Sequence, residues 1–227
     1  MTNPRDAFLQ SVRQAVAAGN RAGSAPALPE RGVTGYQGAG ADPVARFCDE
    51  LTAVGGQAHV VADHAAARAR VVELVQATKA RRALVGRGPF LDALGLPEAL
   101  RRLDLDVTPA DAVPPDSARD AYFAADVGIT GVDFLVAETG TVVLFARPHE
   151  PRSVSLLPPV HIAVAERRQL LPDLFDLFAA LAPDAAAGAL PSCLALITGP
   201  SKTGDIELRL VTGVHGPGEV HVVLVAS

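Results

Sequence analysis

The sequence predicts an α/β fold in which a mainly parallel sheet is flanked by helices. Helical and extended patterns alternate through the first half of the chain, and this order is typical of parallel strands covered by helices. The chain has 227 residues, of which 49% are hydrophobic, so it can bury a core of this kind. The predicted helices of this half are 43–54, 65–80, 90–103 and 117–125, and the predicted strands are 59–62, 82–86 and 106–108.

The first predicted helix has the clearest end signals. Asp42 precedes it as an N-cap residue, and Val44, Phe47, Leu51 and Val54 recur in helical register. A Gly-Gly pair follows directly and ends the pattern before the first apolar strand. These residues predict one helix-strand unit, which the later segments repeat.

The second half of the chain is predicted to be rich in strands. The stretch 127–145 combines apolar residues with Gly/Thr turns and predicts three short strands. In 205–211 apolar and polar residues alternate, and with 220–225 this segment predicts a terminal hairpin around T-G-V-H-G-P-G-E. Between them we expect a strand at 161–165, a helix at 170–181 and a buried strand at 191–198.

The N-terminal part of the sequence differs from the rest. Phe8, Val12 and Val16 recur at intervals of four and predict a short amphipathic helix, which could serve as a docking arm. The segment up to residue 40 is rich in Gly, Pro, Ala and Ser and is typical of a linker. We therefore expect an N-terminal helix and linker over 1–40 and a single α/β domain over 41–227.

Composition excludes several classes of function. Lys and Arg total 20 against 25 Asp and Glu, and the net charge of -5 without a basic cluster makes nucleic acid an unfavourable partner. The N-terminus is charged, and no apolar run reaches the roughly 18 residues of a membrane span, so a cytoplasmic location without a membrane span is expected. The two cysteines, Cys48 and Cys193, form no C-x-x-C pair, and the histidines show no H-x-x-x-H or comparable spacing with acids, so we expect no metal or cluster cofactor in this chain.

A loop near the C-terminus, I-T-G-P-S-K-T-G-D-I-E at 197–207, has the residue types that bind anions. Gly199, Ser201, Thr203 and Gly204 would emerge at a sheet edge. There the backbone N–H groups, the two hydroxyls and the ammonium of Lys202 could hold a phosphate or carboxylate. The spacing does not match the G-x-x-x-x-G-K-[ST] pattern of a nucleotide P-loop, and the segment after it alternates like a strand. The alternative is a plain turn that Pro200 and Asp205 stabilise.

Other polar residues are candidates for chemistry. Glu138 interrupts an apolar stretch in A-E-T-G-T, and it is either satisfied by neighbouring groups or available as a nucleophile or general base. Asp133 either pairs with Glu138 or caps the adjacent Gly turn. His215 lies in a glycine-rich loop and could reach a pocket or remain on the surface. Arg147, His149 and Arg152 form either a cationic clamp for a carboxylate or a solvated loop.

Four blocks of the sequence together resemble one known family. They read G-I-T-G-V-D-F-L-V-A-E-T-G-T-V-V-L, R-S-V-S-L-L-P-P-V-H-I-A-V, T-G-P-S-K-T-G-D-I-E and G-V-H-G-P-G-E-V-H-V-V-L. In this order, over roughly residues 125 to 225, they look like the signature blocks of the lactate-utilisation protein C family (LUD domain). The first half of the chain resembles that family only in its pattern of helices and strands.

The resemblance implies a fold and a pathway. The fold is of the NagB/RpiA/CoA transferase-like type, shared by glucosamine-6-phosphate deaminase, ribose-5-phosphate isomerase and coenzyme A transferases. The implied role is in the oxidation of L-lactate to pyruvate beside iron-sulfur partner proteins, which would carry the clusters. The family supplies no settled catalytic residues, so its motif positions transfer only as expected pocket residues. These are Thr130, Gly131, Glu138, Thr139, Gly140, Gly199, Ser201, Thr203, Asp205, His215 and Gly216.

Three functions are therefore open from the sequence. The first is a non-redox subunit of a lactate-oxidising complex. The second is a stand-alone enzyme on a small anionic metabolite, such as a coenzyme A ester or a sugar phosphate, with Glu138 as nucleophile or base. The third is a regulatory module that binds a metabolite without altering it.

Overall fold

The computed structural model describes residues 3–19, 38–206 and 209–226 of the chain. The chain divides into two units, Met1–Tyr36 and Gln37–Ser227. In the first unit the described part is the helix α1 (Pro4–Gly19), whose apolar residues Phe8, Val12 and Val16 are exposed. Most of the predicted linker lies outside the described residues. Among the helices of the described part, none is both long and apolar enough to cross a membrane.

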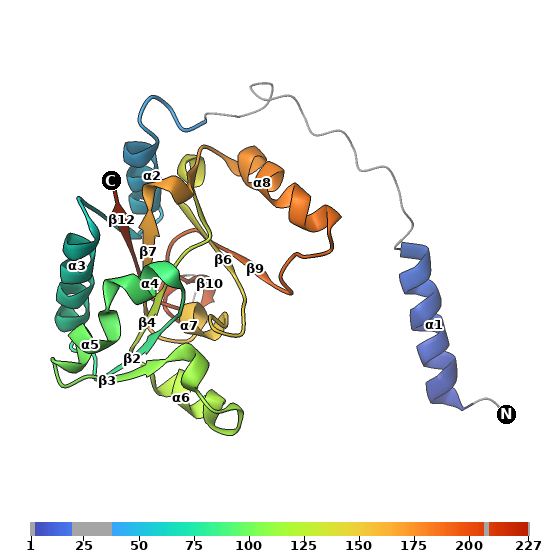
Figure 1. Cartoon of the computed structure of the whole chain (residues 1–227). Coiled ribbons are helices and arrows are strands. Elements are labelled where there is room, and N and C mark those ends of the chain that lie inside the picture. Colours follow the sequence, from blue (N-terminus) through green and yellow to red (C-terminus); the bar gives the residue numbers. More distant parts are fainter. Residues whose placement is uncertain (1–2, 20–37, 207–208, 227) are drawn as a thin grey trace. The chain divides into compact units, whose positions relative to one another are not determined.

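A six-stranded parallel sheet forms the centre of the second unit (Figure 1). Its strand order is β1-β12-β7-β4-β2-β3, and every neighbouring pair runs parallel. The prediction of an α/β fold with a mainly parallel sheet flanked by helices is therefore confirmed. The strands are β1 (Gln57–Val61), β2 (Arg82–Val85), β3 (Asp106–Pro109), β4 (Val127–Thr130), β7 (Val160–Glu166) and β12 (Glu219–Val225).

Helices cover both faces of this sheet. One face packs against α3, α4 and α5 through a buried cluster of Val, Leu, Ile and Ala side chains. The other face packs against α2 and against a second, smaller sheet, with Phe47 and Leu51 fully buried in the contact. The helices are α2 (Pro43–Ala53), α3 (His64–Ala77), α4 (Pro89–Leu94), α5 (Leu96–Arg101), α6 (Ala118–Ala124) and α7 (Ser153–Leu156), with short 3-10 turns at Ala110–Ala112 and Pro115–Ser117.

The second sheet has four strands in the order β8-β5-β6-β9. Its strands are β5 (Phe134–Val136), β6 (Thr141–Phe145), β8 (Leu170–Leu171) and β9 (Leu194–Ile197), with 3-10 turns at Ala137–Thr139 and Arg167–Gln169. The helix α8 (Leu174–Ala186) covers its outer face through Leu177 and Leu181. The three strands predicted in 127–145 are present, but they belong to two sheets: β4 lies in the central sheet and β5 and β6 in the smaller one.

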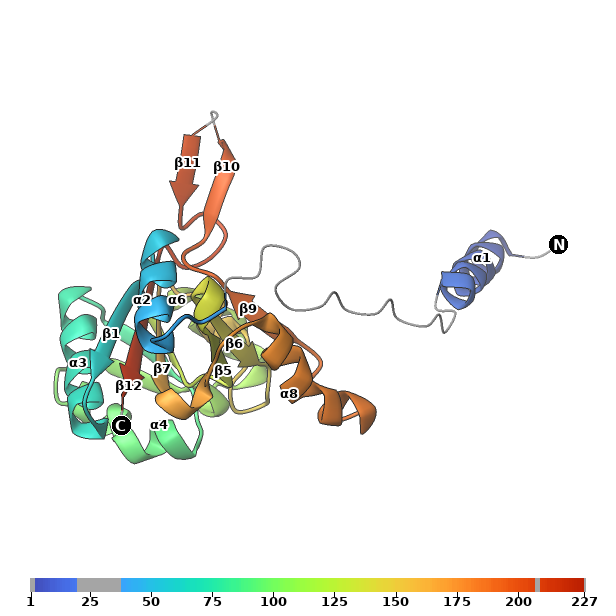
Figure 2. The same cartoon turned by 90° about the horizontal axis from the view of Figure 1, so that it is seen from above.

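The predicted terminal hairpin is wrong. The segment 205–211 is divided between β10 (Lys202–Ile206) and β11 (Arg209–Thr212), which pair antiparallel with each other, and residues 207–208 lie outside the described part. Figure 2 shows this β10–β11 pair standing away from both sheets. The last strand, β12, instead lies between β1 and β7 in the central sheet, because its near-continuous apolar run suits a strand buried on both faces.

Three other predicted segments differ in detail. The helix predicted over 90–103 breaks into α4 and α5 at Gly95, whose φ of 59° lies in the left-handed region. The helix predicted over 170–181 begins later, because Asp173 caps α8 with its carboxylate on the N–H of Asp176, and Leu170–Leu171 extends the smaller sheet. The strand predicted as buried, β9, is an edge strand whose Leu196 is 46% exposed.

Helix α2 begins as the sequence predicts and rests on the turn between β5 and β6. Asp42 Oδ1 accepts hydrogen bonds from the N–H groups of Val44 and Ala45, at 3.0 and 3.1 Å. The helix lies so close to Gly140 that a Cβ built there would be 2.3 Å from the nitrogen of Leu51. Gly140 also has a φ of 62°, so both its backbone conformation and the close helix exclude a side chain.

We expect Gly140→Ala to lower the free energy of unfolding by at least about 3 kcal/mol, because strain at positive φ and a clash with the α2 backbone add. The matched control is Gly188→Ala. Gly188 has a φ of 66° but nothing within 4 Å of a built Cβ. That control should cost only about 1 kcal/mol, the strain alone. Urea unfolding measures both values, and equal losses would contradict the close packing of α2.

Candidate functional site

A cavity of about 350 Å³ lies where three parallel strands of the central sheet end. The loops that follow β2, β4 and β7 line it, at residues 87–91, 131–133 and 168–169, and the loop after β6 closes it with Arg147, His149 and Glu150. Ligands of open α/β sheets bind at the carboxyl ends of the strands. The volume falls in the range of small-molecule sites. This cavity is the candidate functional site.

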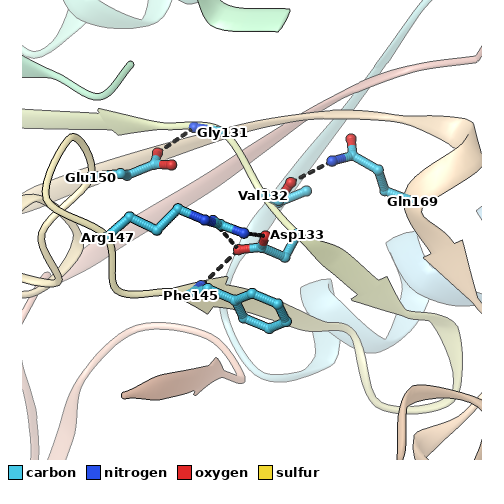
Figure 3. A network of polar contacts seen from close by, with 7 residues as sticks. All are labelled: Gly131, Val132, Asp133, Phe145, Arg147, Glu150 and Gln169. Carbon is cyan, nitrogen blue, oxygen red and sulfur yellow. Dashed lines mark hydrogen bonds and ion pairs between the residues drawn. The ribbon is translucent and has the colours of Figure 1, made fainter. Parts of the chain in front are cut away.

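An ion pair fixes one wall of the cavity (Figure 3). The Arg147 guanidinium donates to both carboxylate oxygens of Asp133, at 2.5 and 3.1 Å, and the N–H of Phe145 donates to Asp133 at 2.7 Å. The guanidinium also lies 5.1 Å from the centre of the Phe145 ring. The hydrogen bonds to Asp133 raise the pKa of Arg147 above its usual value. The pair ties the start of β5 to the end of β6.

A tight turn, R-P-H-E, places Arg147 and Glu150 at the same cavity. The N–H of Arg147 donates to the carbonyl of Glu150 at 3.1 Å, and the N–H of Glu150 donates to the carbonyl of Arg147 at 3.0 Å. Pro148 stands at the second position of this four-residue turn, where its fixed φ is favourable. The sequence signal for this geometry is a proline turn directly after an apolar strand.

The carboxyl group of Glu150 is the most perturbed acid of the site. Its Oε1 accepts a hydrogen bond from the N–H of Gly131 at 2.8 Å. It also lies against Gly86, where a built Cβ would be 2.6 Å from Oε1. Burial raises the pKa of Glu150 to about 7, with Asp133 adding to the rise and with the Gly131 N–H and Arg147 opposing it. Both protonation states of Glu150 are therefore populated near neutral pH.

Two further arginines lie at the opening of the cavity. Arg87 pairs with Asp92 at 3.2 Å, and Arg168 pairs with Glu166. Their side chains are 42% and 77% exposed, and exposed pairs of this kind contribute little stability. These two pairs therefore do little to hold either guanidinium in place.

Some residues expected from the sequence meet at this cavity. Gly131, Asp133, Arg147 and His149 line it. Thr130 precedes Gly131 at the end of β4 and is buried, with its hydroxyl 2.9 Å from His161 Nε2. Glu150 was missed by the sequence analysis, because its burial and its contact with Gly131 depend on residues far away in the chain.

A second group of expected residues lies beneath α2. The hydroxyl of Thr139 is 2.7 Å from that of Thr141, which is 2.8 Å from that of Thr198. The N–H of Glu138 donates to the carbonyl of Pro172 at 3.0 Å, and its side chain is half-buried. Gly140 and Gly199 both lie against α2. Glu138 is not among the residues that line the cavity of Glu150.

A third group surrounds the base of the β10–β11 pair. The N–H of Ser201 donates to the carbonyl of Pro217 at 2.9 Å, and Gly216 lies against the Ser201 side chain. The backbone at Thr203 and Asp205 belongs to β10, and the Asp205 side chain lies outside the described residues. His215 is exposed.

The ammonium of Lys202, which the sequence suggested for an anion, contacts the protein itself. Its Nζ donates to the carbonyl of Val54 at 2.6 Å, and Val54 is the C-cap residue of α2. A cation at this place also interacts favourably with the negative, C-terminal end of the α2 helix dipole. In the described part of the chain, no group of three or more His, Cys, Asp or Glu side chains could bind a metal ion.

The fold and the cavity define an α/β protein whose candidate site lies at the carboxyl edge of a parallel sheet. The chain belongs to the LUD domain family, whose profile matches residues 44–225. This confirms the resemblance found in the sequence blocks. A solved structure with the same fold is that of a DUF162 family protein from Deinococcus radiodurans, with a TM-score of 0.57 and 22% identity over 81% of this chain and 96% of that one.

Several relatives carry the name "Lactate utilization protein C". One from Halalkalibacterium halodurans is 40% identical over 139 residues, which are 61% of this chain and 60% of that protein. One from a Geobacillus species is 37% identical over 168 residues, 69% of this chain and 70% of that protein. One from Bacillus subtilis is 44% identical over 104 residues, 45% of this chain and 43% of that protein. The matched stretch thus spans between 43% and 70% of the length of these relatives.

We expect Asp133→Ala to lower the free energy of unfolding by about 2 kcal/mol, because it leaves the Phe145 N–H and the half-buried Arg147 without their acceptor. The control is Glu73→Ala. Glu73 pairs with Arg70 at 2.9 Å on the surface, with a side chain 61% exposed. Its loss should cost less than about 0.5 kcal/mol. Urea unfolding compares the two variants, and a neutral Asp133→Ala would show that the pair does not hold the cavity wall.

A pH dependence of stability follows from His161, which is fully buried. Burial lowers its pKa to about 4, with the nearby His221 contributing. The unfolded chain, with an ordinary histidine pKa of about 6.5, takes up this proton first as the pH falls. The stability that neutral His161 provides is thus fully present above pH ~6.5 and is lost between ~6.5 and ~4, by up to about 3 kcal/mol.

His161→Gln should therefore reduce the loss of stability between about pH 7 and about pH 4.5. The remaining slope belongs to His59, whose pKa burial also lowers to about 4, and to other groups. Unfolding free energies at the two pH values, compared between wild type and variant, measure the difference. An unchanged slope would mean that His161 does not resist protonation.

Proposed function

We propose that this chain is a non-redox subunit that acts with iron-sulfur partner proteins in the oxidation of L-lactate to pyruvate. The observation that carries the proposal is the 37% identity over 168 residues to a protein named "Lactate utilization protein C", 70% of whose length is matched. Cys48 and Cys193 do not supply the thiolates of a typical four-cysteine cluster. The proposed electron carriers therefore belong to the partner proteins.

The chemistry of the cavity supports a small carboxylate as the ligand. The chain as a whole is acidic, with a net charge of -5, but three arginines line this cavity: Arg87, Arg147 and Arg168. Guanidinium groups bind carboxylates through two parallel hydrogen bonds. Arg147 already donates hydrogen bonds to both carboxylate oxygens of Asp133. Arg87 and Arg168 are therefore the side chains proposed to bind the carboxylate of lactate or pyruvate.

The subunit role predicts a gain in activity on reconstitution. Addition of this chain to its iron-sulfur partners should increase lactate-dependent reduction of a dye. Arg87→Glu should lower the apparent affinity for lactate about tenfold, since it removes one charge-assisted contact. Arg119→Glu is the charge-matched control, because Arg119 is exposed on α6 and does not line the cavity.

The rate of dye reduction without this chain is the reference. A rate that is the same with and without the chain would refute the subunit role. Turnover of lactate by this chain alone would instead assign it an enzymatic activity of its own.

A further inference from the structure

The Glu150 side chain presents only one of its two carboxyl oxygens to the protein. Oε1 accepts the Gly131 N–H, and in the part of the chain that the structure describes Oε2 has no hydrogen-bond partner. Figure 3 shows the carboxyl group between the Gly131 backbone and the Arg147 side chain. Because Glu150 lines the cavity, Oε2 is the oxygen that a ligand can contact.

The position of this carboxyl group is fixed from two sides. Gly86 follows β2 directly, and its missing side chain leaves the space that Oε1 occupies. The reciprocal backbone hydrogen bonds between Arg147 and Glu150 hold the turn from the other side. If an anion in the cavity repelled the Glu150 carboxylate, the side chain could move away only by opening this turn or by losing the hydrogen bond from Gly131.

The surrounding charges do not favour an ionised Glu150 beside an anion. The positive charge of Arg147 favours ionised Glu150, but the two hydrogen bonds of Arg147 go to Asp133, which itself repels Glu150. On its other side Glu150 borders a small gap next to Ser155. The other charged or titratable groups that line its two cavities are Arg87, His149, Arg168, Arg152 and Cys193.

An anionic ligand in contact with ionised Glu150 would be strongly repelled. Two like charges about 4 Å apart interact by about 4 kcal/mol at the effective dielectric constant of ~20 that suits protein sites, which corresponds to roughly a thousandfold in affinity. A protonated Glu150 removes this repulsion and donates its O–H to the ligand. Two carboxyl groups that share one proton in this way are a known solution to close acidic pairs.

We propose that the cavity binds a small carboxylate together with one proton, which the Oε2 atom of Glu150 donates to the ligand as a hydrogen bond. The arginines at the opening provide the countercharge. Gly131 fixes the carboxyl group in the orientation that this contact needs. The inference rests on the proposed function only for the choice of lactate and pyruvate as probes.

The direction of the pH effect follows from proton linkage. Glu150 of the free protein loses its proton as the pH rises through about 7. Above that pH the dissociation constant for a carboxylate should rise about tenfold per pH unit, because each binding event must first restore the proton. Below it, affinity should vary little with pH until the ligand itself is protonated.

The experiment is isothermal titration of the full chain with L-lactate and with pyruvate, from about pH 6 to about pH 9, in buffers of different ionisation enthalpy. The wild-type protein should take up close to one proton per bound ligand at the upper end of this range. Glu150→Gln should bind at all pH values nearly as well as the wild type does at low pH. Glutamine is neutral, keeps an acceptor for Gly131 and offers an N–H donor to the ligand.

Glu73→Gln is the matched control, because it makes the same change on the exposed face of α3. It should keep the wild-type pH dependence. A wild-type affinity that does not change with pH, a Glu150→Gln variant that retains the wild-type pH dependence, or no binding of either carboxylate would overturn the proposal. Proton uptake by the wild type decides the question even if Glu150→Gln does not fold.

The outcome can be separated from that of the subunit role. Proton-linked binding with no effect of the chain on dye reduction would reject the role and retain the site. If the chain affects dye reduction but binds the carboxylate without taking up a proton, the subunit role is retained and the proton-linked site is rejected.

Discussion

The position of β12 is the constraint on which the rest of the α/β unit depends. This strand pairs along its length with β7 on one side and with β1 on the other, so it joins β1 to the remaining strands of the sheet. Its buried residues contribute to the clusters on both faces. Without β12 the sheet would lack the strand that α2 and α3 cover on its two faces. The parallel register also places the carboxyl ends of the strands at one edge, where the cavity opens.

The fold places the cavity, and a few polar contacts determine which side chains line it. The central sheet brings the ends of β2, β4 and β7 to one edge, but it does not determine which side chains meet there. That is determined by Asp133 and Arg147, which join the loop after β4 to the end of β6, and by the turn that carries Glu150. Because these contacts lie at the ends of the paired strands β5 and β6 and in the turn after β6, the chemical character of the site depends on the smaller sheet as much as on the parallel one.

Local signals were enough to predict much of the fold but little of the site. The cap at Asp42 and the alternation of helices and strands involve neighbours in sequence, so they could be predicted. The partner of β12 could not, because a buried apolar strand carries no signal that distinguishes β7 from a nearby antiparallel partner. Glu138 stands out in the sequence because it interrupts an apolar run. Glu150 ends a proline turn and has no such signal, and its contacts with Gly86 and Gly131 form only in the folded chain.

The place of β12 in chain order also affects how the protein can be made. Among the strands of the central sheet, β1 comes first and β12 last, yet the two are neighbours in the folded unit. During synthesis from the N-terminus, β1 therefore has no strand to pair with until β12 has been translated, near the end of the domain. Until then the edges of β1 and β7 that pair with β12 in the folded unit are open, and an open strand edge can pair with another chain.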